Sequence, residues 1–338
     1  MLLTKNKTAR TKSNSYIDFG DIVTKSKLNN THKPVLLDEI IEGLKINPSG
    51  TYIDATCGEG GHSFEIIKHL NKNGTLLSLD TDSIILEKMK ARISKQELKI
   101  LKSFHTNYIY IKDILEKVSI NSVDGILFDL GLSLYQIKNS GRGFSFNANE
   151  PLDMRFDINN QIKADDIVNK SSLAKLQYII KTYGEEKHSN IIAKNIINNR
   201  PIQNSFHLAE IIRNIKRNHP KHIDPSTRTF QAIRIHINQE LETLKKSLEK
   251  TYNILAPKGR LVLITYHSLE ERIIKDFITL TDKSLSAPKD LPLTEQFLTK
   301  MFKIINKPLK PTDEEIEINK KSRSAKLNVL EKYNENNS

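Results

Sequence analysis

The stretch TYIDATCGEGGHSFEIIKHLNKNGTLLSLD, residues 51–80, decides the fold. It opens with a β-rich run at 51–54, passes through a glycine-rich loop and continues with apolar residues at helical spacing. Gly74 is placed to end that helix, and a second β-rich run then ends at Asp80. This order of strand, glycine-rich loop, helix and acid-terminated strand is typical of the first half of a doubly wound parallel sheet.

Strand-like sequence continues downstream at 123–129 and resumes only at 259–265, after a helical pattern that we expect to run from 229 to about 255. Residues 137–227, between the two strand-like runs, combine polar turns with helical patterns and carry a net charge of +5. We therefore expect a helical domain inserted into an α/β domain. Further patterns predict a loop at 281–298 and short strands near 303–305 and 325–330.

The composition limits the class of partner and compartment. The 338 residues carry a formal charge of +12, which favours a polyanionic partner. The single cysteine, Cys57, excludes an intrachain disulfide and a cysteine-rich zinc cluster, and it favours a reducing compartment. No apolar run approaches the ~18 residues of a transmembrane helix. We therefore expect no membrane span.

Residues 54–62 (DATCGEGGH) predict a cofactor site. Strand-end glycines let the backbone approach a ligand closely, and the helix that follows presents free N–H groups. Asp80 is placed to accept hydrogen bonds from both hydroxyls of a ribose. The loop resembles the D/E-x-x-x-G-x-G loop of S-adenosylmethionine enzymes better than the G-x-G-x-x-G loop of dinucleotide enzymes. A helix cap or surface acid is the alternative for Asp80, and a structural histidine is the alternative for His62.

A set of short sequence words occurs in order from about residue 32 to 332, and the set as a whole is specific although each word alone is weak. The words are HKPVLLDE at 32–39, YIDAT at 52–56, GGHS at 60–63, FDLG at 128–131, RGFSF at 142–146, PLDMR at 151–155, YGEE at 183–186, TRTFQA at 227–232, HSLE at 267–270 and SRSAKL at 322–327. In these words the chain resembles the MraW/RsmH family, the bacterial 16S ribosomal RNA (cytosine-N4) methyltransferases.

The resemblance implies an α/β fold, a class I (Rossmann-like) methyltransferase doubly wound sheet with an inserted helical domain. It implies methyl transfer from S-adenosyl-L-methionine to the exocyclic N4 of a cytidine in the decoding region of small-subunit (16S) rRNA. The partner is then naked small-subunit rRNA or the assembled small subunit, in the bacterial cytoplasm. The family's cofactor-binding positions fall here on Gly60, Gly61, His62, Asp80, Phe104, Asp129 and Gln136.

The resemblance also suggests a division of the chain. We expect a discontinuous methyltransferase domain at 32–136 and 228–332, with the helical insertion at 137–227 recognising RNA. Residues 1–31 are basic and lack the apolar core of a secretory signal, so we interpret them as a disordered arm. Their first 17 residues contain no acid, which leaves organellar targeting open. Residues 333–338 are expected to be a frayed tail.

The chain departs from the family's usual pattern at three places near the predicted site. Glu59 stands in the glycine-rich loop, Ser133-Leu134-Tyr135 replaces Ser-Ser-Pro, and Gly141 replaces an acid before Arg142. These changes bear on the detailed geometry of the site more than on the type of reaction.

Asp129 ends the strand at 123–129 and is the candidate for a catalytic role. The N4 amine of cytosine is a poor nucleophile, and an acceptor at its N–H would help to localise the lone pair. DNA amino-methyltransferases often carry D/N-P-P-Y at this place, whereas this chain has Asp-Leu-Gly-Leu at 129–132. We therefore rank Asp129 as a cofactor contact above a proton acceptor, with a cap on the next turn as the alternative.

Aromatic and arginine side chains suit the binding of a base that has left its stack. For Phe144 the alternative is packing in the core. For Arg228, Arg234 and Asn238, on the helix after 227, the alternative is a buried ion-pair network. For His267 it is a polar residue that is satisfied within the protein. No His, Cys or Asp cluster has the spacing of metal ligands, so we expect no metal. The candidates for RNA contact are Arg142, Phe144, Arg155, Arg228, Arg234, Asn238 and His267.

Other classes of function stay open. One is a ribosome assembly factor that binds S-adenosylmethionine without turnover, which Glu59 and the altered turn at 133–135 support slightly. Another is an amino-methyltransferase with a different acceptor. The missing Pro-Pro-aromatic turn counts against DNA as that acceptor, and the basic arm and insertion count against a small molecule. The loop spacing disfavours a dehydrogenase.

Overall fold

The structure, a computed structural model, describes residues 34–215, 224–281, 301–320 and 322–333. Three expectations fall on segments outside these residues. They are the basic arm at 1–31, the loop at 281–298 apart from Thr281, and the tail at 333–338 apart from Tyr333. These three expectations stay predictions.

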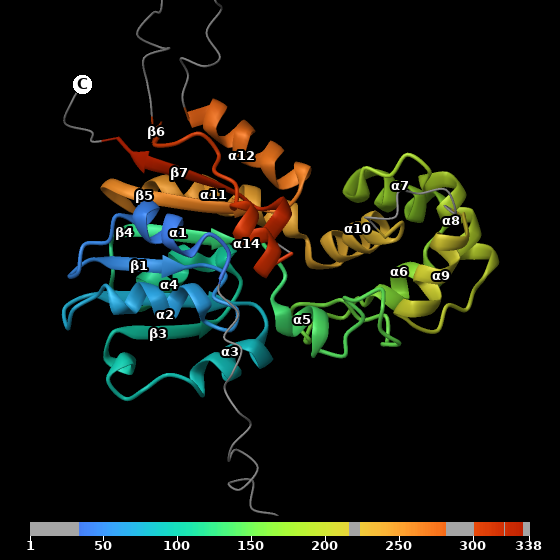
Figure 1. Ribbon diagram of the computed structural model, residues 1–338, viewed down its shortest axis with the longest axis horizontal. Coiled ribbons are helices and arrows are strands. Elements are labelled where there is room, and N and C mark those ends of the chain that lie inside the picture. The colour runs from blue at the N-terminus through green and yellow to red at the C-terminus, as the bar shows by residue number, and fades with distance from the viewer. Residues whose placement is uncertain (1–33, 216–223, 282–300, 321, 334–338) are drawn as a thin grey trace, which may run out of the picture. The chain divides into compact units, whose positions relative to one another are not determined.

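One sheet organises the α/β part of the chain (Figure 1). Within the described residues its seven strands lie in the order β3-β2-β1-β4-β5-β7-β6. Neighbours from β3 to β5 are parallel, whereas β7 runs antiparallel to β5 and β6. The strand order reverses between β1 and β4, which is where doubly wound sheets bind ligands. The bounds are β1 Thr51–Asp54, β2 Thr75–Asp80, β3 Leu101–His105, β4 Val123–Asp129, β5 Leu255–Thr265, β6 Phe302–Ile304 and β7 Lys326–Lys332.

Helices cover both faces of this sheet, and alternate strand residues contact opposite layers. On β1, Tyr52 packs in the core formed with α1, α2 and α3, while the next residue, Ile53, packs in the core formed with α4, α11 and α12. Strands buried on both faces have continuous apolar sequences, which is why the sequence revealed them. The helices are α1 Leu37–Leu44, α2 Gly61–Lys68, α3 Ser83–Lys90, α4 Ile111–Lys117, α11 Glu240–Ile254, α12 Ser268–Thr281 and α14 Asp313–Ile318, with short 3₁₀ turns at η1 Glu97–Lys99, η2 Tyr108–Tyr110 and η4 Ser322–Ser324.

A helical segment is inserted between β4 and β5 and has a hydrophobic core of its own. The buried members of that core all come from residues 144–237. They include Phe230, Ile233 and Ile237 of α10, so this core extends beyond the expected boundary at 227. The division into domains stays a prediction. The helices are α5 Leu134–Lys138, α6 Ala164–Lys170, α7 Leu173–Gly184, α8 Ser189–Asn198, α9 Ser205–Ile215 and α10 Thr227–Asn238.

The single helix expected from 229 to about 255 is wrong. The chain forms two helices, α10 and α11, that meet at Gln239, which adopts a left-handed conformation (φ 52°). No glycine or proline marks the break in the sequence. The side chain of Asn238, immediately before the break, bonds instead to the backbone of Met154 and Phe156. A tertiary contact that the local pattern does not reveal therefore accompanies the end of α10.

The expected fold class, a doubly wound α/β sheet with an inserted helical segment, is confirmed. Among the helices that the structure describes, none has both the length and the apolar character needed to cross a lipid bilayer. Because the strand order reverses between β1 and β4, we expect the ligand site at the carboxyl ends of β1, β2 and β4.

Candidate active site at the carboxyl ends of the parallel strands

Three acids end three neighbouring strands. Asp54 is the last residue of β1, Asp80 of β2 and Asp129 of β4. Because β1 pairs in parallel with both β2 and β4, the three carboxylates meet at one edge of the sheet. This edge is the usual ligand site of an open α/β sheet.

The loop between β1 and α2 is tightly packed at two of its glycines. A Cβ on Gly60 (φ 87°) would lie 2.6 Å from the Phe64 ring, and one on Gly61 would lie 2.7 Å from Pro34. These two glycines, both expected at the cofactor, therefore allow the loop to pack against the protein. Beside Gly58 (φ 53°), in contrast, the nearest atom that such a Cβ would meet is Ser133 Cβ at 3.9 Å. Gly58, which the sequence analysis did not single out, leaves room for a ligand to approach the backbone.

Asp80 holds this loop and keeps capacity for further donors. Its Oδ2 accepts the N–H of Gly58 (2.8 Å), and its Oδ1 accepts the N–H of Asp82 (2.8 Å). A carboxylate offers about four lone-pair sites, so both oxygens can accept one more hydrogen bond. Burial raises the pKa of Asp80 to about 6. These properties fit a ribose whose two hydroxyls donate to one carboxylate.

His62, at the start of α2, is buried, and neither ring nitrogen has a hydrogen-bond partner in the described part of the chain. Its Nε2 lies 3.5 Å from Asp129 Oδ2, which is longer than a hydrogen bond. Buried polar atoms are nearly always paired, so two unpaired ring nitrogens at this edge fit a site that receives a polar ligand. The position agrees with the expected role of His62 at the cofactor, which stays a prediction.

Asp129 is held by two hydrogen bonds, one that it donates and one that it accepts. Its backbone N–H donates to Thr56 Oγ1 (2.7 Å), and its Oδ1 accepts the hydroxyl of Tyr266 (2.8 Å). Burial and the Asp129 charge hold the pKa of Tyr266 well above its ordinary value, so the phenol stays protonated and donates. Tyr266 was not among the sequence candidates. Its place directly after β5, whose last residue is Thr265, is the signal that would have identified it.

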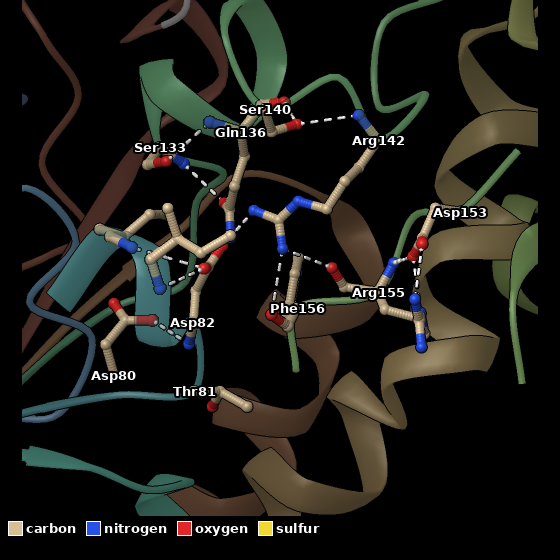
Figure 2. Close-up of polar contacts among 12 residues, drawn as sticks. Asp80, Thr81, Asp82, Ser133, Gln136, Ser140, Arg142, Asp153, Arg155 and Phe156 are labelled. Carbon is tan, nitrogen blue, oxygen red and sulfur yellow. Dashed lines mark hydrogen bonds and ion pairs between the residues drawn. The ribbon is translucent and has the colours of Figure 1, made fainter. Parts of the chain in front are cut away.

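Gln136 lies at the start of α5 and joins two networks (Figure 2). It forms a capping box with Ser133, in which the Gln136 N–H donates to Ser133 Oγ (3.0 Å) and the Ser133 N–H donates to Gln136 Oε1 (3.0 Å). Its Nε2 donates to Asp82 Oδ2 (3.3 Å). Although Ser133-Leu134-Tyr135 replaces the family's usual Ser-Ser-Pro, α5 therefore begins with a complete capping box.

Phe104 and Asp54 complete the described edge. Phe104 on β3 is in register with Leu79 on β2, one residue before Asp80, and is half-buried. Asp54 is buried, and its Oδ2 accepts the Ser63 hydroxyl (2.7 Å). Burial raises the pKa of Asp54. The bond from Ser63 connects Asp54 to the first turn of α2.

The residues expected to contact RNA already have protein partners. Arg155 pairs with Asp153 through two bonds of 2.7 Å, and Arg234 pairs with Glu240 through bonds of 2.8 and 2.9 Å. Asn238 bonds to backbone atoms of 154 and 156, as described above. For these three residues the contacts agree with the alternative of an internal network, and their expected role toward RNA stays a prediction.

The other expected RNA contacts differ in exposure. Phe144 is buried and stacks on Phe156, with ring centroids 5.9 Å apart. Arg228 is exposed and donates to the Glu185 carbonyl (3.1 Å). His267 lies after β5, and its Nε2 is 3.1 Å from Glu270 Oε1, off the line of a hydrogen bond. Of this group Arg228 alone has an exposed side chain.

Arg142 is buried, and its guanidinium forms an ion pair with Asp82, a carboxylate that the sequence analysis did not single out. In Figure 2 this Arg142–Asp82 pair lies between the labelled residues Gln136 and Phe156. Asp82 also caps α3 by accepting the N–H groups of Ile84 and Ile85. Across residues 34–215, 224–281, 301–320 and 322–333, no cluster of three or more His, Cys, Asp or Glu side chains is arranged to hold a metal ion.

Comparison with known proteins places these features in a family. The model of the MraW methylase family matches residues 29–333. The ribosomal RNA small subunit methyltransferase H of Legionella pneumophila (strain Corby) is 41% identical, over 89% of this chain and 98% of the relative. The protein of the same description from Caldicellulosiruptor saccharolyticus is 42% identical, over 89% and 99% of the two chains.

A solved rRNA methylase structure from Streptococcus thermophilus aligns with a TM-score of 0.40 at 12% identity, over 88% of this chain and 93% of the other. That likeness is too low to bear on the fold or function. The match of the family model over nearly the whole chain, together with relatives of similar length at 41% and 42% identity, decides the assignment. This chain belongs to the MraW methylase family.

Proposed function

We propose that this protein transfers a methyl group from S-adenosyl-L-methionine to the exocyclic N4 of a cytidine in the decoding region of small-subunit rRNA. The observation that carries the proposal is the similarity, over 98% and 99% of their length, to relatives described as ribosomal RNA small subunit methyltransferases. The edge formed by β1, β2 and β4 supports it, because Asp80 and the unpaired nitrogens of His62 fit a polar nucleoside cofactor.

The sulfonium group of S-adenosylmethionine supplies the methyl as a strong electrophile. Asp80 would accept the ribose hydroxyls, and the Gly58 N–H that donates to Asp80 holds the loop beside it. His62 offers a buried ring nitrogen to a polar group of the cofactor or acceptor. Holding nitrogen, carbon and sulfur in line lowers the barrier by several kcal/mol without any covalent participation of the protein.

Asp129 stays, in first place, a candidate cofactor contact, and it is also the acceptor that this edge offers to the target amine. Its Oδ1 is oriented by Tyr266, and its Oδ2 points within 3.5 Å of His62. An N–H of the cytosine amine that donates to Oδ2 would direct the nitrogen lone pair toward the methyl group. The N–CH3 bond would form as the S–CH3 bond breaks, S-adenosylhomocysteine would leave, and the proton lost from N4 would pass to Oδ2. The cytidine must leave its stack to reach this position.

A direct assay tests the reaction. Purified protein and S-adenosylmethionine are incubated with unmodified small ribosomal subunits and, in parallel, with naked rRNA, and N4-methylcytidine is measured by nucleoside mass spectrometry. We expect its formation on one of the two substrates. Cofactor binding without methyl transfer to either substrate would favour the assembly factor without turnover. A third reaction supplies DNA, and transfer to DNA without transfer to rRNA would favour the amino-methyltransferase with another acceptor.

Cofactor binding should depend on pH through Asp80. Burial raises the pKa of Asp80 to about 6, and the ribose hydroxyls require the ionised form as acceptor. Protons therefore compete with the cofactor, and the affinity for S-adenosylhomocysteine should fall below pH 6 by up to about tenfold per pH unit while staying level between pH 7 and 8. Calorimetric titration at each pH measures it. An Asp80→Asn variant should show a flat profile, and an equally sloping one would contradict the assignment.

Removing the Tyr266 hydroxyl should slow methyl transfer. In Tyr266→Phe the Asp129 carboxylate loses the donor that orients it, and a hydrogen bond to a charged group contributes about 1.5–3 kcal/mol. We expect kcat to fall by about 10- to 100-fold with KM for the cofactor nearly unchanged. Tyr252→Phe, on α11 away from this edge, is the matched control. Unchanged kcat in Tyr266→Phe would remove Tyr266 from the mechanism.

A further inference from the structure

Asp82 contacts Asp80, the carboxylate proposed to bind the ribose, although Asp82 is not among the expected cofactor-binding residues. Its side chain is fully buried, and its backbone N–H donates to Asp80 Oδ1 (2.8 Å). Its own Oδ1 accepts the N–H groups of Ile84 (3.2 Å) and Ile85 (3.4 Å) at the start of α3. Because hydrogen bonds hold both the backbone and the side chain of Asp82, a shift of the Asp80 carboxylate should shift Asp82 as well.

The second oxygen of Asp82 faces away from α3 and toward the start of the helical segment. It accepts Nε2 of Gln136 (3.3 Å) and Nη2 of Arg142. Figure 2 shows the Arg142 guanidinium between Asp82 and Phe156. The chain near Arg142 is itself held, because the Arg142 carbonyl accepts the N–H of Met154 (2.8 Å).

Arg142 passes the connection on to the helical segment. Its Nη1 donates to the carbonyls of Arg155 (2.9 Å) and Phe156 (3.2 Å). The Phe156 N–H then donates to Asn238 Oδ1 (2.7 Å) at the end of α10. An unbroken series of polar contacts thus joins the carboxylate at the end of β2 to the helix by which the chain returns from the insertion.

This arrangement is not the one that stability alone would favour. A buried ion pair is often replaceable by apolar side chains without loss of stability. The pair also leaves Arg142 Nε buried without a hydrogen-bond partner among the described residues, which is costly. A function that needs the connection accounts for retaining it.

We propose that Asp82 is a positioning residue whose ion pair with Arg142 couples occupancy of the cofactor's ribose site to the segment 142–156 and to α10. A ribose bound at Asp80 would further stabilise the contact between Asp80 and Asp82, and through the Asp82–Arg142 pair it would stabilise the backbone at 155 and 156. The helical segment is thereby set for the RNA once the cofactor is bound. The inference rests on the proposed function, because the methyl donor and the RNA are the two ligands that it couples.

Hydrogen exchange measured by mass spectrometry tests the coupling without RNA. The full chain is compared with and without S-adenosylhomocysteine, and calorimetry establishes that this probe binds. In the wild-type protein we expect the probe to slow amide exchange in peptides that cover 142–156 by about fivefold or more, in addition to the loop at 55–60.

Two double variants separate coupling from stability. Asp82→Asn with Arg142→Met removes both charges and leaves no unpaired one, so it should fold. The matched control, Arg260→Met with Glu331→Gln, removes another half-buried ion pair (2.7 Å) that joins β5 to β7 away from the cofactor edge. Melting temperatures verify that both are folded. With S-adenosylhomocysteine at saturation, the slowing of amide exchange that it causes at 142–156 should be lost in the Asp82/Arg142 variant and kept in the control.

The outcomes are distinguishable. Protection of 142–156 that survives in the Asp82/Arg142 variant, or that is absent from a wild-type protein that binds the probe, overturns the coupling and leaves the proposed function intact. A wild-type protein that does not bind S-adenosylhomocysteine overturns both. With methyl transfer as a second readout, a positioning role predicts a fall in kcat for the Asp82/Arg142 variant but not for the control.

Discussion

Replacement of Asp80 with alanine is expected to weaken S-adenosylmethionine binding by about 10²- to 10⁴-fold. The carboxylate would accept two ribose hydroxyls, and hydrogen bonds to a charged group contribute about 1.5–3 kcal/mol each. Two of them amount to about 3–6 kcal/mol, where each 1.4 kcal/mol is a factor of ten in Kd. Alanine also releases the N–H groups of Gly58 and Asp82, which places the effect toward the upper end.

Calorimetric titration with S-adenosylhomocysteine measures this change, and Asp113→Ala is the control. Asp113 is an exposed acid on α4, so its removal alters the net charge equally without touching the loop at 55–60. A loss of less than about fivefold in Asp80→Ala would mean that the ribose binds elsewhere. Loss of N4-methylcytidine in parallel with loss of binding would connect the site to the reaction.

Replacement of Arg142 with methionine is expected to lower the free energy of unfolding by about 3 kcal/mol. Methionine fills much of the same volume but leaves the Asp82 carboxylate buried without its cation, which typically costs 3–5 kcal/mol. The lower end applies because Asp82 keeps the α3 N–H groups and the Gln136 amide as donors. Urea unfolding followed by circular dichroism measures the change through the transition midpoint.

Arg272→Met is the matched control for that measurement. Arg272 also pairs with a carboxylate, Glu185, at 2.8 Å, but both side chains are exposed. Water solvates the carboxylate that remains, so the midpoint should stay close to that of the wild-type protein. Adding Asp82→Asn to Arg142→Met should recover most of the lost stability. Equal midpoints for Arg142→Met and the wild type would show that water reaches the Asp82 carboxylate.

Local patterns predicted the framework of the site. The acids at 54, 80 and 129 follow apolar runs that belong to strands buried on both faces, and such runs are legible without any knowledge of their neighbours. The glycine-rich loop and its helix are likewise contiguous in the sequence. Knowing that parallel strands end at one edge was then enough to bring Asp80 and Asp129 together.

Long-range partners escaped prediction. Arg142 meets Asp82 across 60 positions, and Tyr266 meets Asp129 across 137. Neither pairing leaves a periodic trace, because each depends on how two separate loops are brought together by the sheet. The break at Gln239 was hidden for a similar reason: Asn238 bonds to the backbone of Phe156 and Met154, which are 82 and 84 positions away. Three arginines that suggested RNA contact from residue type, Arg142, Arg155 and Arg234, have carboxylate partners in the fold, and their role toward RNA stays a prediction.

The self-contained core of residues 144–237 has a consequence for the order of folding. Strands β4 and β5 pair directly, although the chain between Asp129 and Leu255 must first be brought back on itself. Closing so long a loop costs conformational entropy, and such non-local pairing slows folding. Helices α6 to α10 share that one hydrophobic core, and we expect them to fold early as one unit. That early unit shortens the effective loop, so the insertion assists the pairing of the two strands that it separates.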